Sequence, residues 1–110
     1  MMDFNEYQKQ SRKTAIYPNK GKNYIYPALG LGGESGEVLE KIKKLIRDKN
    51  GKIDKEFLLL VEKELGDVLW YVSNLASEFK MKMDDIATNN IKKLANRAKR
   101  NKLHGSGDLR

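Results

Sequence analysis

The sequence predicts an all-α protein, and three observations support this expectation. Strict alternation of apolar and polar residues, the pattern of strands, is almost absent along the 110 residues. Apolar residues instead recur at helical spacing in four segments, which are separated by turns containing Pro or Gly or by a short basic link. The chain shows no internal repeat. At this length we expect one domain, residues 1–110, with a four-helix bundle-like fold whose small core a second copy completes.

The first helix is expected over residues 3–16. Asp3 followed by Glu6 resembles a capping box, in which side chains bond the unpaired amides of a first helical turn. Tyr17 and Pro18 end this helix, because a proline ring is incompatible with a continuing helix.

The second helix is expected over residues 27–48. Pro27 suits a first helical turn, where a missing amide hydrogen costs nothing. Asn50 and Gly51 then close the helix. The stretch before it, residues 19–26, is polar and reads as a connection.

A third helix is expected over residues 54–79 and a fourth over residues 84–101. Asp84 has the side chain of a good N-cap. The remaining residues, 102–110, contain two glycines and little apolar content, so we expect a tail or a closing flap.

Four glycines lie in the first half of the second helix, where each costs roughly 1 kcal/mol relative to alanine. Two interpretations stay open. Either the helix begins later and the glycines belong to a loop, or a neighbouring helix or ligand approaches the backbone as closely as only glycine permits. The residues are Gly30, Gly32, Gly33 and Gly36.

Composition excludes several classes of site. With no cysteine and one histidine, the chain has no thiolate zinc site, no cysteine nucleophile and no histidine-rich metal site. The longest apolar run, residues 57–61, is far shorter than the roughly 18 residues of a membrane span, so we expect a soluble, cytoplasmic protein. The net charge of +7 suggests a polyanionic partner or ligand.

Two pairs of carboxylates are the sharpest signal. Glu34 with Glu37, and Glu64 with Asp67, are each spaced i, i+3, which places both members on one helix face. On a helical wheel, the first member of each pair lies about 20–80° from the residues of its helix's apolar stripe. If the two stripes pack together, four carboxylates converge.

Such a cluster would lose hydration and repel itself unless a cation compensates. Oxygen ligands favour hard ions, so we expect Mg²⁺, with Mn²⁺ as a substitute. The alternative is that each glutamate is an ordinary ion-paired residue beside the core. The matched position of the two pairs relative to their stripes favours the metal site.

These residues resemble the signature of the MazG-like nucleotide pyrophosphohydrolases, members of the all-α nucleoside triphosphate pyrophosphatase superfamily. That signature is ExxE, a helix-and-turn spacer, and ExxD. The resemblance extends to the flanking segments and covers nearly the whole chain from Tyr7 onward. The matching segments are residues 29–38, 43–48, 64–71, 90–97 and 104–108.

The resemblance implies Mg²⁺-dependent cleavage of a nucleoside triphosphate to the monophosphate and pyrophosphate. It implies a helical bundle of the MazG type that forms homodimers, in some members paired into tetramers. It also implies that Glu34, Glu37, Glu64 and Asp67 are metal ligands and catalytic residues. Glu37 is our candidate for orienting or deprotonating the attacking water.

Basic side chains are then expected to hold the phosphates. Lys41 and Lys44 lie within about 20° of Glu34 and Glu37, respectively, on the second helix. Asn90, Lys93 and Arg97 form one polar stripe on the fourth helix, where the alternative is an ordinary solvated basic face. For the tail the alternatives are disorder and a flap over the phosphates, with His104 and Ser106 as contacts.

The third helix carries a second apolar face, which predicts a homodimer because a small chain can hardly bury a helix on all sides. Its residues are Leu58, Leu59, Leu69 and Trp70. Trp70 has an alternative role, stacking on a nucleobase. Tyr17, Tyr24 and Tyr26 are further candidates for the base, with turn packing as the alternative.

Two functions compete with hydrolysis of canonical or damaged (deoxy)nucleoside triphosphates. One is a basic helical module that binds nucleic acid without catalysis. The other is a nucleotide sensor that keeps the metal site. A nucleic-acid binder gains nothing from carboxylates at the edges of two core stripes, so we expect an enzyme, with no membrane partner and no nucleic acid.

Overall fold

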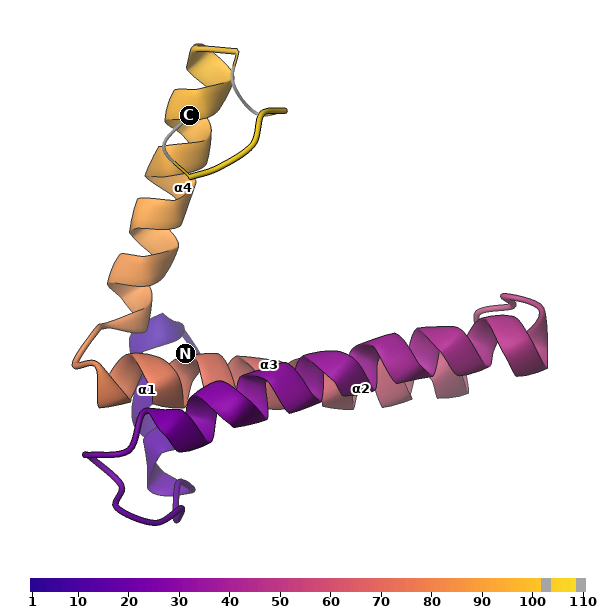
Figure 1. The fold of residues 1–110 in the computed structure, drawn as a ribbon, viewed down its shortest axis with the longest axis horizontal. Helices are drawn as coiled ribbons and strands as arrows, with labels where there is room; N and C mark the ends of the chain where they lie inside the picture. The colour runs from indigo at the N-terminus through magenta and orange to yellow at the C-terminus, as the bar shows by residue number, and fades with distance from the viewer. Residues whose placement is uncertain (102–103, 109–110) are drawn as a thin grey trace.

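The computed structural model describes residues 1–101 and 104–108, so part of the predicted tail, 102–103 and 109–110, lies outside the described residues. It contains four helices, and α2 and α3 form a long hairpin that α1 crosses while α4 projects away from it (Figure 1). No strand occurs among the described residues, and the all-α prediction is confirmed. No helix in this part of the chain has the length and apolar character needed to cross a membrane. The helices are α1 (Phe4–Lys13), α2 (Ile25–Lys49), α3 (Lys55–Glu78) and α4 (Met83–Lys99).

Helices α1 and α3 begin where the sequence predicts. The carboxylate of Asp3 accepts a hydrogen bond from the amide of Glu6 at 2.8 Å, and that of Asp54 accepts one from the amide of Phe57 at 2.9 Å. Both caps join residues three positions apart, so the local sequence is enough to specify them. Helix α1 ends at Lys13, before the predicted residue 16.

Helix α4 begins one residue before the predicted cap, and the prediction of Asp84 as N-cap is wrong. The cap position is Lys82, and the amide of Met83 donates to the side-chain oxygen of Gln8 in α1 at 2.9 Å. A residue 75 positions away therefore satisfies the first amide of this helix. Asp84 and Asp85 instead lie in the first turn, where their charges favour the helix dipole.

Helix α2 begins at Ile25 and includes all four glycines, so the interpretation that they belong to a loop is wrong. At Gly30 the close approach is present, because an added Cβ would lie 2.1 Å from Cε1 of Tyr71 in α3. Among the described residues, Gly32, Gly33 and Gly36 have nothing within 4 Å of an added Cβ. Gly30 therefore makes room for the ring of Tyr71, and the other three glycines have no such neighbour among the described residues.

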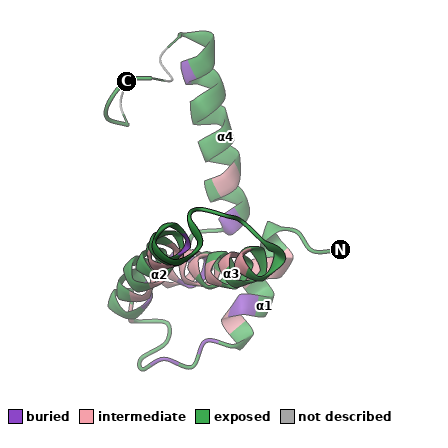
Figure 2. Ribbon diagram, turned by 90° about the vertical axis from the view of Figure 1, so that its right-hand side faces the viewer, coloured by how far each residue is buried: buried purple, intermediate pink, exposed green. Residues whose placement is uncertain are grey.

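The buried part of the chain is small and lies mainly around the crossing of α1 and α3. The hydroxyls of Ser11 and Ser73 are 2.7 Å apart across this crossing. Figure 2 shows exposed residues along most of α4 and the outer faces of the hairpin. The buried residues include Ala15, Tyr17, Leu45, Ala76, Met83, Ser73, Asn74 and Arg97.

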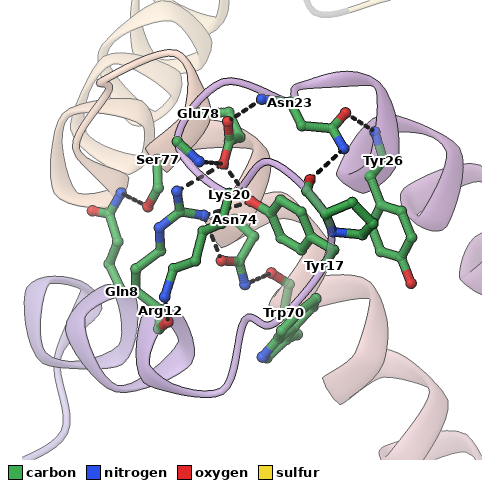
Figure 3. Close-up of polar contacts among 12 residues, drawn as sticks. Gln8, Arg12, Tyr17, Lys20, Asn23, Tyr26, Trp70, Asn74, Ser77 and Glu78 are labelled. Atoms are coloured by element: carbon green, nitrogen blue, oxygen red, sulfur yellow. Dashed lines mark hydrogen bonds and ion pairs between the residues drawn. The ribbon is translucent and has the colours of Figure 1, made fainter.

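A carboxylate at the end of α3 fastens the connection between α1 and α2 (Figure 3). The side chain of Glu78 is 1% exposed and pairs with Arg12 at 2.7 Å. It also accepts from the hydroxyl of Tyr17 and from the amides of Gly21 and Asn23. Burial alone would raise the pKa of Glu78, but these hydrogen bonds outweigh it and lower the pKa to about 2.

Candidate functional site

The antiparallel packing of α2 and α3 places the two carboxylate pairs beside each other along the hairpin. The contact between Gly30 and Tyr71 lies one helical turn from Glu34 in α2 and from Asp67 in α3, so these two side chains meet. One carboxylate oxygen from each of Glu34, Glu64 and Asp67 lies within 4.8 Å of the other two. We call these three residues the acidic group.

The acidic group is electrostatically strained. Partial burial raises the pKa of Glu34 above its ordinary value of 4.5, and the charges of Asp67, Glu64 and Glu37 raise it further. A hydrogen bond with Glu64 also raises it, since one of two paired carboxylates must then hold a proton. Each of these charged neighbours is itself a carboxylate, so the site is one that a cation would relieve.

Glu37 stands beside the acidic group rather than in it. The sequence predicted that four carboxylates converge, and the structure brings three of them together. Glu37 is exposed, yet close enough for its charge to raise the pKa of Glu34. Three oxygen donors at this separation fit a hard divalent ion, which keeps its remaining positions for water and substrate oxygens.

An open hollow of about 360 Å³ adjoins the acidic group. The indole nitrogen of Trp70 donates to the hydroxyl of Thr14 at 2.8 Å, which ties α3 to the end of α1 beside the hollow. The ring of Trp70 meets that of Tyr71 edge-on, with centroids 5.0 Å apart. The hollow is lined by Thr14, Glu34, Asp67, Trp70 and Tyr71.

Sequence reasoning missed Thr14 and Tyr71 as members of this site. Tyr71 directly follows Trp70 in the segment that resembles the family, and this was the available signal. Thr14 follows the last residue of α1, and only the packing of α1 across α3 brings it to the hollow.

The predicted phosphate contacts on α2 lie apart from the acidic group. Lys41 and Lys44 line a second hollow, of about 160 Å³, together with Phe57 and Leu60 near the α2–α3 turn. Lys41 is seven residues beyond Glu34, about 10 Å along the helix axis. In this structure the two lysines therefore line a hollow other than the one beside the acidic group.

The predicted phosphate contacts on α4 lie still further away within one chain. Helix α4 packs against α1 and projects away from the hairpin (Figures 1 and 2). Lys93 and Arg97 come together on this helix and both contact Asp108, while Asn90 is exposed. In the tail, His104 and Ser106 are exposed.

The predicted dimer face is available on the surface. Leu58 and Leu59 are 56% and 60% exposed, and Leu69 is 37% exposed. Trp70 is half-buried and lies in the wall of the hollow.

The three tyrosines considered for the base have packing roles in the structure. Tyr17 is buried and stacks on Tyr26 with ring centroids 5.0 Å apart. Tyr24 stacks on Phe79 at 5.4 Å. These contacts agree with the turn-packing alternative.

Comparisons with known proteins point the same way as the acidic group. The family of the MazG nucleotide pyrophosphohydrolase domain matches residues 27–101, which include all four predicted carboxylates. The chain is similar to the "Gene 37 protein" of Mycobacterium phage L5, with 40% identity over 109 residues that cover 94% of this chain and 96% of that protein. No solved structure shows significant similarity to the chain. On the match over residues 27–101, the chain belongs to the MazG nucleotide pyrophosphohydrolase domain family.

Proposed function

We propose that this protein is a nucleoside triphosphate pyrophosphohydrolase that cleaves (deoxy)nucleoside triphosphates to the monophosphate and pyrophosphate. Membership of the MazG family supports enzymes of this general type. The observation that carries the finer proposal is the acidic group, in which Glu34, Glu64 and Asp67 present oxygens to a common point.

The acidic group would hold Mg²⁺, or Mn²⁺ in its place. When bound, such an ion neutralises charge on phosphate oxygens and lowers the pKa of a bound water. Glu37 is exposed at the edge of the group, where it can orient the attacking water and accept its proton. The adjoining hollow offers room for part of the nucleotide, and the indole face of Trp70 offers a stacking surface there.

A homodimer forms the second part of the proposal, with a dimer of dimers as a further assembly. Leu58, Leu59 and Leu69 expose apolar surface that a second copy would cover. Within one chain, α4 projects away from the acidic group. Lys93 and Arg97 of that chain therefore do not lie beside phosphates held by its own acidic group. A second copy that brings its own α4 against the hairpin would supply them.

Pyrophosphate release from a panel of nucleoside triphosphates, with and without Mg²⁺, tests the activity. We expect Mg²⁺-dependent release that falls more than about 100-fold in Glu64→Gln, because even residues that only orient metal ligands cost 10–100-fold when removed. Glu62→Gln is the matched control, since it removes the same charge from an exposed position of α3 outside the acidic group.

Three outcomes are decisive. Full activity in Glu64→Gln would show that the acidic group is not the catalytic site. No turnover of any nucleotide, with Mg²⁺-dependent nucleotide binding retained, would favour the sensor. No turnover together with tight binding of nucleic acid would favour the basic helical module.

A further inference from the structure

The basic stripe of α4 already holds an anion, and that anion comes from the chain itself. The carboxylate oxygen Oδ1 of Asp108 lies 3.1 Å from Nζ of Lys93 and 3.2 Å from Nη2 of Arg97. Nη2 of Arg97 also donates to the backbone carbonyl of Asp108. One oxygen atom is thus shared between two cations that lie one helical turn apart.

The two sides of this contact differ in burial. The side chain of Arg97 is 5% exposed, whereas that of Asp108 is 80% exposed. A buried guanidinium needs an anionic partner, because leaving it unpaired is costly. The partner present lies at the surface, where water and dissolved anions reach it. The Lys93–Arg97 pair is therefore an anion-binding site. The anion that occupies it, the carboxylate of Asp108, is exposed to solvent.

We propose that Asp108 is an internal competitor that occupies the Lys93–Arg97 pair until a phosphate oxyanion displaces it. The choice of pyrophosphate as the displacing ligand rests on the proposed function, since pyrophosphate is the product of that reaction. The exchange replaces one carboxylate by an ion of higher charge, and both cations keep an anionic partner throughout.

The Asp108 side chain is the exchangeable part of the contact. It is 80% exposed, and the ion pairs of exposed carboxylates typically change an equilibrium constant by only a factor of about two to five. The buried guanidinium of Arg97 needs an anion, and a phosphate oxygen meets that need as well as a carboxylate does. A phosphate group offers three terminal oxygens to the planar guanidinium and the ammonium, where Asp108 offers one carboxylate oxygen to both.

At neutral pH, Asp108 leaves the Lys93–Arg97 pair only when another anion displaces it, because it does not become protonated there. Hydrogen bonds from Lys93 and Arg97, and their charges, hold the pKa of Asp108 below its ordinary value of 3.8. Asp108 therefore carries its charge throughout the neutral pH range. The other acidic residues of α4, Asp84 and Asp85, lie in its first turn, at the opposite end of the helix from Arg97.

Calorimetric titration of the full chain with inorganic pyrophosphate, in the presence of a chelator, tests the proposal. The chelator removes divalent ions, so that pyrophosphate cannot bind through the acidic group. We expect Asp108→Asn to bind pyrophosphate about two- to fivefold more tightly than the unsubstituted chain. Asp85→Asn is the matched control, since it removes the same charge from the other end of α4 and should leave the affinity nearly unchanged. Lys93→Gln should weaken binding.

A second measurement uses the unsubstituted chain, so that its result does not depend on whether a substitution disturbs the fold. Pyrophosphate added to the unsubstituted chain should move the amide NMR signals of Gly105 and Gly107 towards their positions in Asp108→Asn. Equal or weaker binding by Asp108→Asn would overturn the proposal, because Asp108 would then support the site instead of competing for it. Absence of these shifts at saturating pyrophosphate would also overturn it.

The outcomes separate this proposal from the proposed function. A chain that hydrolyses no nucleotide but shows this order of affinities disproves the enzyme and leaves the internal competitor standing. A chain that hydrolyses nucleotides while Asp108→Asn and Asp85→Asn bind pyrophosphate alike disproves the competitor alone.

Discussion

Two carboxylates in the same half of the α2–α3 hairpin have opposite environments. Glu78 is surrounded by donors, and their hydrogen bonds lower its pKa to about 2. Glu34 is surrounded by other carboxylates, and its pKa is raised. Donors of the chain surround Glu78, whereas the charges that shift the pKa of Glu34 are those of other carboxylates. The first site therefore stabilises the fold, and the second is suited to an ion from outside.

The largest expected effect is at Glu78. Glu78→Gln removes one partner of a buried ion pair with Arg12, which typically costs about 3–5 kcal/mol. We expect a loss of this size in the free energy of unfolding, measured by urea denaturation at a fixed protein concentration. Glu62→Gln, at an exposed position of the same helix, should change it by less than about 0.5 kcal/mol.

The pH dependence of the same variant sharpens this prediction. The pKa of Glu78 is lower in the folded protein than the ordinary 4.5, so its contribution to stability is complete above pH 4.5 and is lost as the pH falls towards 2. Between these pH values the unsubstituted chain should lose roughly 3 kcal/mol more than Glu78→Gln. Parallel pH profiles for the two proteins would show that Glu78 is not the stabilising carboxylate.

An intermediate effect is expected at Gly30, which makes room for the ring of Tyr71 beside the acidic group. Gly30→Ala should destabilise the protein by about 1–3 kcal/mol, the usual cost of overpacking. Gly33→Ala is the matched control, because an added methyl there meets nothing within 4 Å among the described residues. We expect Gly33→Ala to raise stability by about 0.5–1 kcal/mol, since alanine favours the helix. If the two variants have equal thermal stability, the ring of Tyr71 does not require a glycine at position 30.

The smallest effect is expected within the acidic group without metal. Glu64→Gln should raise the free energy of unfolding by a few tenths to about 1 kcal/mol, because it relieves repulsion among partly exposed charges. Added Mg²⁺ should stabilise the unsubstituted chain more than this variant, since only the former keeps all three carboxylates. If Glu64→Gln is less stable than the unsubstituted chain without metal, Glu64 stabilises the fold in the way that Glu78 does.

The sequence could predict those parts of the fold and site that depend on neighbouring residues. The cap of α1 at Asp3 is a bond between residues three apart, and the sequence predicted it. For α3 the sequence predicted a beginning at residue 54, where Asp54 is the cap. Helical periodicity predicted that four carboxylates converge if the two apolar stripes pack together, and three of the four do so, without Glu37. The start of α4 could not be located in this way, because Gln8 of α1 caps it.

What the sequence by itself determined is the helical class of the protein, the family signature and the four carboxylates from which the acidic group is drawn. Their spacing acts through one or two turns of helix, a distance over which covalent geometry fixes relative position. Only the tertiary structure decided that three of the four carboxylates meet, that the ring of Tyr71 packs on Gly30, that Thr14 lines the hollow, and that Asp108 pairs with Arg97. These contacts join separate segments of the chain, and their formation depends on how whole helices pack and not on the pattern within any one of them.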